Sequence, residues 1–243
     1  EYPHQKLKSG GGLGTSIKNL VEALVEKGVR VSVLAYQQEN DFFFEEDGIR
    51  FYGFKKMQYP FLGWWRYRKH LQNVINKIIS AENINLLEAP DWTGITAFMK
   101  FKVPLVVRFH GSDAYFCKLE RRKQKFKNFF FEKMALLGAS AYIAPTNFAG
   151  EVTQKIFGLD TKKIKVIHYG LKTESFVNTE PESFQQKTLL NVGTLIRKKG
   201  VFELVEIFNK LIEKEPDAIL KLIGADAADI ATGSPSTFEL MKK

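Results

Sequence analysis

The hydrophobic positions along the chain alternate between a spacing typical of helices and a spacing typical of strands. Residues 15–28 carry apolar side chains at intervals of three and four positions, which predicts an amphipathic helix. Residues 29–35 follow as a strand rich in β-branched side chains. The same cycle then repeats, with a helical stripe over residues 71–79 and a short strand over residues 84–88. This alternation predicts βαβ units.

Further along the chain, short apolar runs that predict strands cover residues 104–109, 141–145 and 164–168. Longer segments of mixed polarity, some of helix length, separate them. Strands that alternate with helices imply a mostly parallel, doubly wound sheet. The sequence therefore predicts an α/β fold with a Rossmann-like first domain over residues 1–170.

A change of composition marks a second domain. Residues 171–186 are mostly Thr, Glu, Ser, Asn, Pro and Gln, as expected of a linker. Residues 187–243 then restart the cycle as a strand, a helix and a strand, at residues 188–192, 200–214 and 218–223. This βαβ unit is too small to close a core well by itself. In addition, no strand precedes the glycine-rich loop near the amino terminus, so we expect the chain to be incomplete at both ends.

The amino-acid composition excludes several classes of protein. The chain has 243 residues, of which 44% are hydrophobic and 26% charged, and a single cysteine, Cys117, so an internal disulfide is excluded. No apolar run reaches the ~18 residues of a membrane-spanning helix, and the first residues lack the pattern of a signal peptide. We therefore expect a cytoplasmic location. The net charge of +9 favours a polyanionic partner, whether phosphate groups, nucleic acid or an anionic membrane.

Residues 10–14 form the sharpest local motif, four glycines around Leu13 that lead directly into the first predicted helix. Glycine lets the backbone approach a ligand closely, and a helix N-terminus offers unpaired N–H groups, so this loop suits a diphosphate. The dinucleotide fingerprint fails because Ile17 stands at its last glycine position, and the P-loop motif is also absent. A merely flexible loop is the alternative.

Polar side chains follow two of the predicted strands. His110 comes directly after the strand at residues 104–109, where doubly wound folds bind ligands. Glu88 and Asp91 lie at the end of another strand, where they could bond sugar hydroxyls or accept a proton. For all three, purely local structural contacts are the alternative. No metal-binding spacing of His, Cys or Asp occurs, so we expect no metal site.

In the second domain, Gly193 ends a strand and Arg197, Lys198 and Lys199 precede a helix. Arginine offers forked hydrogen bonds to phosphate oxygens and lysine offers a mobile point charge. A solvated surface run would have the same composition. The position at a strand-to-helix junction indicates anion binding.

From Lys118 to Lys133 the sequence reads KLERRKQKFKNFFFEK, with seven cations, two acids and four phenylalanines. A basic aromatic helix of this kind suits an anionic membrane surface, and residues 64–69, WWRYRK, have the same character. A solvated helix with its phenylalanines in the core is the alternative. Nucleic acid would accept such a patch too, but no recognised binding module accompanies it.

In their order along the chain, these segments resemble the family 4 glycosyltransferases of the GT-B fold. The matching segments are Gly11-Gly12-Leu13 before the first helix, VVRFHGSD at residues 106–113, PTNF with KVIHYG within residues 145–170, and NVGTL with Lys199-Gly200 in the second domain. Polysaccharide-assembly members are the most similar in the segment from Gly193 to Gly200. No single motif is decisive, but the ordered set is specific.

The resemblance implies a two-domain enzyme that moves a sugar from a nucleotide-diphosphate sugar to a glycan or lipid-linked acceptor. It implies retention of the anomeric configuration without a metal or other cofactor, the acceptor in the first domain and the nucleotide in the second. Gly11 and Gly12 would approach the donor, His110 would contact the sugar near the reacting carbon, and Lys199, assisted by Arg197, would stabilise the departing diphosphate. The resemblance also implies that the sugar transfer serves surface polysaccharide synthesis and that the enzyme lies on the inner face of the membrane.

Two departures from the family pattern matter. Thr194 stands where many members have an arginine, and the E-x7-E motif that grips the donor is expected beyond residue 243. A non-catalytic binder of phosphosugars or anionic lipid is the second hypothesis, because the same basic loops would serve it. Nucleic-acid binding, supported only by charge, is the third and is not expected.

Overall fold

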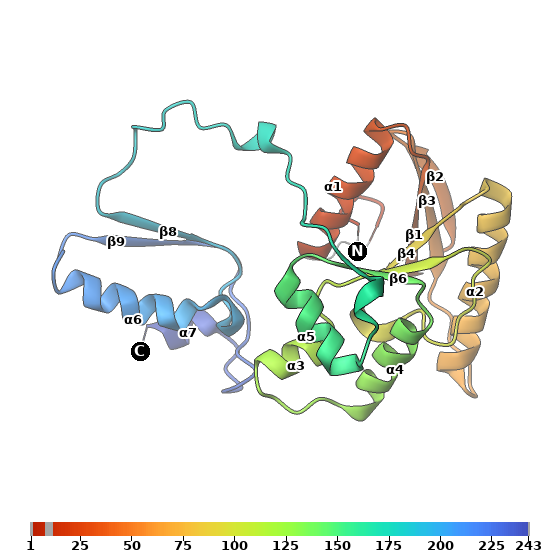
Figure 1. The fold of residues 1–243 in the computed structure, drawn as a ribbon. Helices are drawn as coiled ribbons and strands as arrows, with labels where there is room; N and C mark the ends of the chain where they lie inside the picture. Colours follow the sequence, from red (N-terminus) through yellow and green to blue (C-terminus); the bar gives the residue numbers. More distant parts are fainter. Residues whose placement is uncertain (1, 8–11, 243) are drawn as a thin grey trace. The chain divides into compact units, whose positions relative to one another are not determined.

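The computed structural model describes residues 2–7 and 12–242 and divides the chain into two compact units, Glu1–Ser175 and Phe176–Lys243. The division falls within the predicted linker at residues 171–186, where the short 3₁₀ turn η3 (Thr173–Phe176) lies. Figure 1 shows the elements of both units. Each unit is described by itself below.

The first unit opens with a sheet that is covered by a helix on each face (Figure 1). Its strands have the order β1-β3-β2, and its elements are α1 (Gly12–Glu26), β1 (Val31–Gln38), β2 (Phe42–Glu46), β3 (Ile49–Lys55) and α2 (Gly63–Glu82). Successive side chains of a strand point to opposite faces. Accordingly, Val33 packs with Val21 of α1, while Leu34 packs with Leu71 of α2.

A hairpin interrupts the parallel pattern that the sequence analysis expected. β1 pairs with β3 in parallel, but β2 runs antiparallel to β3. The turn between β2 and β3 consists of Asp47 and Gly48, whose φ angles of 52° and 72° are both positive. Asp-Gly between two apolar runs is a strong hairpin signal, because such turns require positive φ at both central positions. Strand pairing in the first unit is thus mostly parallel, as predicted, and its antiparallel strand β2 lies in a segment that the sequence analysis left unassigned.

The second sheet of this unit is fully parallel, with its strands in chain order β4-β5-β6-β7. Its elements are β4 (Leu87–Pro90), β5 (Leu105–Arg108), α3 (Asp113–Leu119), α4 (Phe126–Leu137), β6 (Ala141–Ala144), α5 (Asn147–Phe157) and β7 (Ile164–Val166). The predicted strands at residues 84–88, 104–109, 141–145 and 164–168 are confirmed, with bounds shifted by a few residues.

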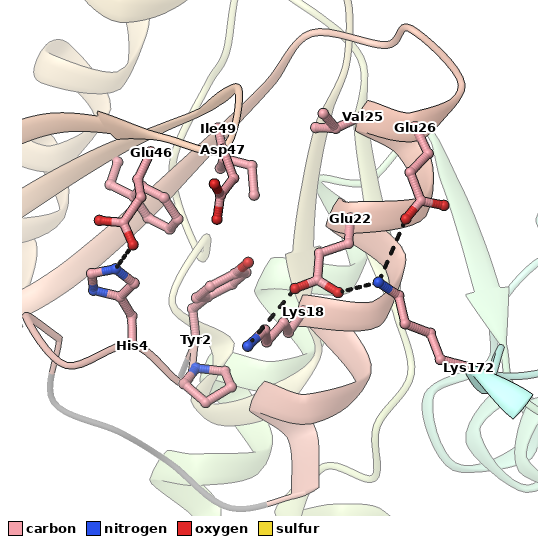
Figure 2. Close-up of a pocket in the computed structure, with 12 residues that line it drawn as sticks. Tyr2, His4, Lys18, Glu22, Val25, Glu26, Glu46, Asp47, Ile49 and Lys172 are labelled. Atoms are coloured by element: carbon pink, nitrogen blue, oxygen red, sulfur yellow. Dashed lines mark hydrogen bonds and ion pairs between the residues drawn. The ribbon is translucent and has the colours of Figure 1, made fainter. Parts of the chain in front are cut away.

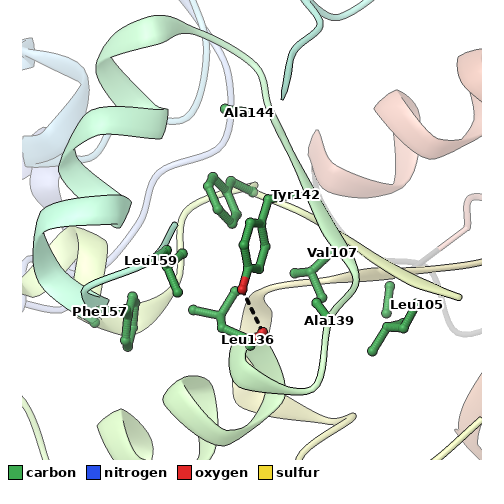
Figure 3. Close-up of a cluster of buried hydrophobic side chains, with 11 residues drawn as sticks. Leu105, Val107, Leu136, Ala139, Tyr142, Ala144, Phe157 and Leu159 are labelled. Atoms are coloured by element: carbon green, nitrogen blue, oxygen red, sulfur yellow. Dashed lines mark hydrogen bonds between the residues drawn. The ribbon is translucent and has the colours of Figure 1, made fainter. Parts of the chain in front are cut away.

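A continuous apolar core lies between this second sheet and its helices (Figure 3). Val107 of β5 and Leu136 of α4 are almost fully buried, and Phe157 of α5 completes the cluster. Tyr142 lies in the same core and donates its hydroxyl proton to the Leu136 carbonyl oxygen at 2.9 Å. The buried polar group is thereby satisfied. The core holds the carboxyl ends of β4 and β5 in fixed positions.

An apolar cavity of about 460 Å³ extends along β1 and β4, the two neighbouring edge strands of the separate sheets. Residues of α1 and α2 complete its lining, among them Ile17, Leu24, Ile75 and Ile78. Edge strands present unpaired backbone N–H and C=O groups. The strand expected before the glycine-rich loop stays a prediction.

The second unit consists of one parallel strand pair covered by helices. Its elements are β8 (Thr188–Val192), the 3₁₀ turn η4 (Arg197–Lys199), α6 (Val201–Ile212), β9 (Ile219–Ile223) and α7 (Thr237–Met241). The predicted strand at residues 188–192 coincides with β8. The small core of this second unit consists of Leu195, Val201 and Met241. At Gly224, φ is 153° and a Cβ would lie 1.9 Å from the Gly193 carbonyl oxygen, so the two chain segments meet where only glycine fits.

Candidate active site

The carboxyl ends of β4 and β5 bring Asp91 and His110 together. The Asp91 backbone N–H donates to the Arg108 carbonyl oxygen at 3.1 Å, which continues the pairing of the two strands. In return, the His110 backbone N–H donates to Asp91 Oδ1 at 2.9 Å. The side chain of Asp91 thus fixes the loop that carries His110. Two residues that the sequence singled out separately form one site at the expected edge of the sheet.

Asp91 is a deeply buried carboxyl group. It is 1% exposed, and its Oδ2 has no hydrogen-bond partner within the part of the chain that the structure describes. Burial raises its pKa to about 7, and the nearby Glu132 carboxylate adds to the increase, while hydrogen bonds from the backbone N–H groups of His110 and Gly111 oppose it. The Asp91 carboxyl group therefore gains or loses its proton near neutral pH.

Burial also favours the uncharged form of His110, so its pKa shifts in the opposite direction. Burial, together with the positive charge of Arg108, lowers its pKa to about 4, so the imidazole is neutral at physiological pH. Its ring stacks on Tyr169, with ring centroids 5.7 Å apart and planes inclined by 12°. The distance between His110 Nδ1 and the Tyr169 hydroxyl oxygen is 2.7 Å, and the same hydroxyl lies 3.3 Å from the Phe109 carbonyl oxygen. The ring is therefore fixed on one edge.

Tyr169 was not among the residues predicted from the sequence. It belongs to the KVIHYG segment that follows β7, which served only to support the resemblance. β7 is two strands away from β5 in the sheet, so the sequence contains no local sign that Tyr169 reaches His110. The signal available was its position at the carboxyl end of a parallel strand, on the same sheet edge as His110.

Glu88 was expected to bind sugar hydroxyls, but the structure gives both of its carboxylate oxygens another partner. Arg108 Nε donates to Oε1 and Arg108 Nη2 donates to Oε2, each at 2.8 Å. Arg108 is 7% exposed, and a buried guanidinium needs a paired carboxylate. The structure therefore shows Glu88 as the electrostatic partner of Arg108. A role of Glu88 in substrate binding stays a prediction.

The basic stretch from Lys118 to Lys133 is not the single amphipathic helix expected from the sequence. α3 ends at Leu119 and α4 begins at Phe126. Within this stretch Glu132 is 1% exposed and accepts hydrogen bonds from the backbone N–H groups of Asp113 at 2.9 Å and Ala114 at 3.1 Å. It thus satisfies the free donors at the start of α3. Burial raises the pKa of Glu132.

The glycine-rich loop is only partly described. Gly10 and Gly11 lie outside the described residues, and α1 begins at Gly12, earlier than the expected helix start at residue 15. Leu13, which the resemblance placed in the substrate site, lines the apolar cavity beside β1. Contacts of Gly11, Gly12 and Leu13 with a donor stay predictions.

In the second unit, Gly193, Arg197 and Lys199 surround the turn that precedes α6. Arg197 donates from Nε and Nη2 to the two carboxylate oxygens of Asp229, at 2.9 and 2.7 Å. These hydrogen bonds hold the pKa of the Asp229 carboxyl well below its usual value. By contrast, the Lys199 ammonium group has no ion pair within the described residues. Of the two predicted phosphate-binding cations, Lys199 is the one available to a ligand.

A separate cavity of about 390 Å³ beside α1 contains none of the predicted site residues (Figure 2). Figure 2 shows Lys172 between two carboxylates of α1, with Nζ 2.8 Å from Glu22 Oε2 and 3.5 Å from Glu26 Oε1. Burial, followed by the charge of Glu22, raises the pKa of Tyr2 to about 12. Both lysines of this cavity, Lys18 and Lys172, form ion pairs with carboxylates of α1, which favours a structural role for them.

Within residues 2–7 and 12–242, no three or more His, Cys, Asp or Glu side chains are grouped so that they could hold a metal ion. In the same ranges, every helix is too short or too polar to cross a membrane.

The chain is similar to known glycosyltransferases in sequence. The family model described as Glycosyltransferase Family 4 matches residues 10–175. An uncharacterised glycosyltransferase of Methanocaldococcus jannaschii is 23% identical over 247 residues, which cover 95% of this chain and 62% of that protein. An uncharacterised glycosyltransferase of Bacillus subtilis is 26% identical over 147 residues, which cover 59% of this chain and 40% of that protein. The chain thus spans less than two thirds of the length of these relatives.

Solved structures show the same fold at low sequence identity. An E. coli structure described as trehalose-6-phosphate bound with UDP-2-fluoro glucose matches with a TM-score of 0.60 at 11% identity, covering 99% of this chain and 66% of that one. A glycosyltransferase from Rickettsia africae matches with a TM-score of 0.54 at 13% identity, covering 89% and 65%. The α/β fold is therefore of the GT-B type, and with the family match over residues 10–175 the chain belongs to Glycosyltransferase Family 4.

Proposed function

We propose that the full-length protein is a retaining glycosyltransferase that moves a sugar from a nucleotide-diphosphate sugar to a glycan or lipid-linked acceptor in surface polysaccharide synthesis. The observation that carries this proposal is the neutral His110, fixed between the buried Asp91 and the stacked Tyr169 at the carboxyl edge of a parallel sheet. In a Family 4 chain, this is the site that the resemblance assigns to the transferred sugar.

The contacts of His110 define what its free ring edge offers to a sugar. The Tyr169 hydroxyl has one proton, and the Phe109 carbonyl oxygen can only accept, so the hydroxyl donates to that oxygen at 3.3 Å. In our proposal His110 Nδ1–H therefore donates to the Tyr169 hydroxyl oxygen at 2.7 Å, which leaves Nε2 without a proton. Nε2 then accepts a hydrogen bond from a hydroxyl group of the sugar near the reacting carbon. A neutral imidazole with a pKa of about 4 does not act as a general acid at neutral pH.

In this proposal Lys199 places its positive charge beside the diphosphate, where negative charge develops during the reaction. In the proposed reaction the acceptor hydroxyl oxygen bonds to the anomeric carbon, the bond from that carbon to the diphosphate breaks, and the hydroxyl proton passes to the leaving diphosphate. Negative charge grows on the diphosphate in the transition state, so a positioned cation accelerates the step. The unpaired ammonium of Lys199, before the first turn of α6, supports this role.

The aromatic and basic residues of the first unit support placement on an anionic membrane face. Residues 64–69 and residues 118–133 are far apart in sequence, but the Trp64 ring lies 5.1 Å from the Phe131 ring in an edge-on arrangement. Phe126 is 80% exposed and Phe130 40% exposed beside them. Exposed aromatic rings with neighbouring cations are typical of surfaces that bind anionic lipid.

Sugar transfer by the full-length protein tests the proposal. We expect a nucleotide-diphosphate sugar to be consumed with release of the nucleoside diphosphate, and NMR of the product to show the anomeric configuration of the donor. His110→Ala should lower kcat by about a hundredfold, because it removes a contact made near the reacting carbon. An inverted product would contradict the retaining mechanism, and unchanged transfer by His110→Ala would contradict the assignment of the site.

A further inference from the structure

A third cavity of the first unit has a volume of about 360 Å³ and lies next to the candidate active site. Side chains of α2, of the turn after β4, of α3 and of α4 line it, namely Trp64, Arg68, Trp92, Thr93, Asp113, Lys127, Asn128, Phe131 and Glu132. Trp92 directly follows Asp91 in the chain, and Asp113 begins the helix that follows His110. A ligand in this cavity would thus lie a short distance from the site of sugar transfer.

The acidic side chains of this cavity are already satisfied. Asp113 accepts hydrogen bonds from Arg122 and Asn128, each at 3.1 Å, and these outweigh burial and hold its pKa below the usual value. Glu132 accepts from two backbone N–H groups and from Gln124 Nε2 at 3.1 Å. Neither carboxylate needs, or neutralises, a cation in the cavity.

The cations of the cavity, by contrast, lack a counter-ion. Arg68 is half-buried, and its Nη1 and Nη2 donate to the backbone carbonyl oxygens of Trp64 and Gly94, at 3.3 and 3.2 Å. Its Nε is buried without a hydrogen-bond partner in the described part of the chain. No carboxylate contributes to the pKa of Arg68, which burial lowers. Lys127 on α4 has no ion pair in residues 2–7 and 12–242.

Aromatic rings give the cavity a second kind of contact. The Phe131 ring lies under the Arg68 guanidinium, 4.4 Å from ring centroid to Cζ, and Trp64 and Trp92 are 40% and 41% exposed. Indole faces of this kind stack on sugar rings or cover apolar chains. A buried guanidinium is costly without a neighbouring anion. The cavity therefore suits a ligand that combines a negative charge with a ring or an apolar chain.

We propose that this cavity binds the phosphate group of a phosphorylated acceptor, with Arg68 and Lys127 as its cations and Trp64 and Trp92 against the group that carries the phosphate. This inference rests on the proposed function, because it names the chemical class of the acceptor. The phosphate belongs either to a soluble sugar phosphate or to a lipid headgroup. Both sources share the same recognition by the two cations.

Tryptophan fluorescence tests the proposal directly, because the chain has three tryptophans, Trp64, Trp65 and Trp92, and two of them line the cavity. We would titrate the full-length protein with glucose 6-phosphate and, separately, with phosphatidylcholine vesicles with and without phosphatidic acid. A saturable change with glucose 6-phosphate indicates a soluble acceptor. A change only with vesicles that contain phosphatidic acid indicates a lipid headgroup.

Matched variants distinguish phosphate binding in the cavity from nonspecific attraction to the protein's positive charge. Lys127→Gln should weaken phosphate binding about tenfold, because one charge-assisted contact is lost. Lys155→Gln removes the same charge from an exposed position of α5, outside both the cavity and the basic stretch, and should leave binding unchanged. Arg68→Met should abolish the fluorescence change. If that variant does not fold, the pair of lysine variants still decides.

Two results would overturn the proposal: no saturable response to either probe, or equal weakening by Lys127→Gln and Lys155→Gln. The assay contains no donor and measures no sugar transfer, so it fails independently of the proposed function. Loss of phosphate binding with intact transfer to an uncharged acceptor would refute this cavity alone. Intact phosphate binding without transfer would refute the glycosyltransferase assignment of the site instead.

Discussion

The candidate sites of the two units hold their polar groups in opposite ways. In the first unit, His110 and Asp91 are both buried, and burial drives both toward the uncharged form. In the second unit, Arg197 and Lys199 stand at an exposed turn, and the hydrogen bonds of Arg197 to Asp229 raise the pKa of Arg197. A buried neutral group positions a substrate by directed hydrogen bonds, whereas an exposed cation attracts phosphate over a distance. In the function that we propose, the first kind of site positions the sugar and the second stabilises the leaving group.

The largest effect should come from the exposed cation. Lys199→Ala in the full-length protein should lower kcat by about a hundred- to a thousandfold, because it removes a charge that acts mainly in the transition state. Steady-state kinetics of nucleoside diphosphate release checks this. Lys210→Ala on the exposed side of α6 is the control and should retain full activity. Equal loss in both variants would show that bulk charge, and not the position of Lys199, matters.

Asp91→Asn should change the pH dependence of stability. The raised pKa of Asp91 contributes stability that is present at low pH and lost as the pH rises through about 7. The asparagine keeps an oxygen acceptor for the His110 backbone N–H but does not titrate. From about pH 5 to about pH 8, the wild-type protein should therefore lose ~3 kcal/mol relative to the variant.

Denaturant unfolding at several pH values measures this difference. Glu151→Gln, which removes an exposed carboxyl on α5, is the matched control and should follow the wild-type curve. The lowered pKa of His110 acts in the opposite direction, since it reduces stability as the pH falls from about 6.5 toward about 4. Parallel curves for wild type and Asp91→Asn would contradict a carboxyl that titrates near neutral pH.

Tyr169→Phe should have a smaller effect on catalysis. The variant keeps the ring that stacks on His110 but loses the hydroxyl that fixes Nδ1. We expect kcat to fall about tenfold or less, which corresponds to one hydrogen bond. ¹⁵N NMR of the imidazole should show a single neutral tautomer in the wild type and a mixture in the variant. A purely structural role of Tyr169 would leave the tautomer unchanged.

Arg197→Lys should have the smallest effect. Lysine keeps the charge but cannot form the forked pair with Asp229, so the second unit should unfold at a lower temperature. Sugar transfer at a permissive temperature should change by about threefold or less. A loss as large as that of Lys199→Ala would instead assign Arg197 directly to the diphosphate.

The amino-acid sequence by itself determined the alternation of strands and helices, the position of His110 at a strand end and the position of Lys199 just before a helix. These features depend on local periodicity and on short motifs, which are readable within one segment. The Asp47-Gly48 hairpin is a local signal of the same kind, although the sequence analysis did not assign it.

Only the tertiary structure decided the environment of the candidate residues. Glu88 is the hydrogen-bond partner of Arg108, and Glu132, which lies in a stretch with a net positive charge, is buried and caps α3. The shifted pKa values of Asp91 and His110 arise from burial, and the contact between Tyr169 and His110 joins positions 59 residues apart. Burial and long-range contacts depend on packing between distant segments, so no local pattern of residues specifies them.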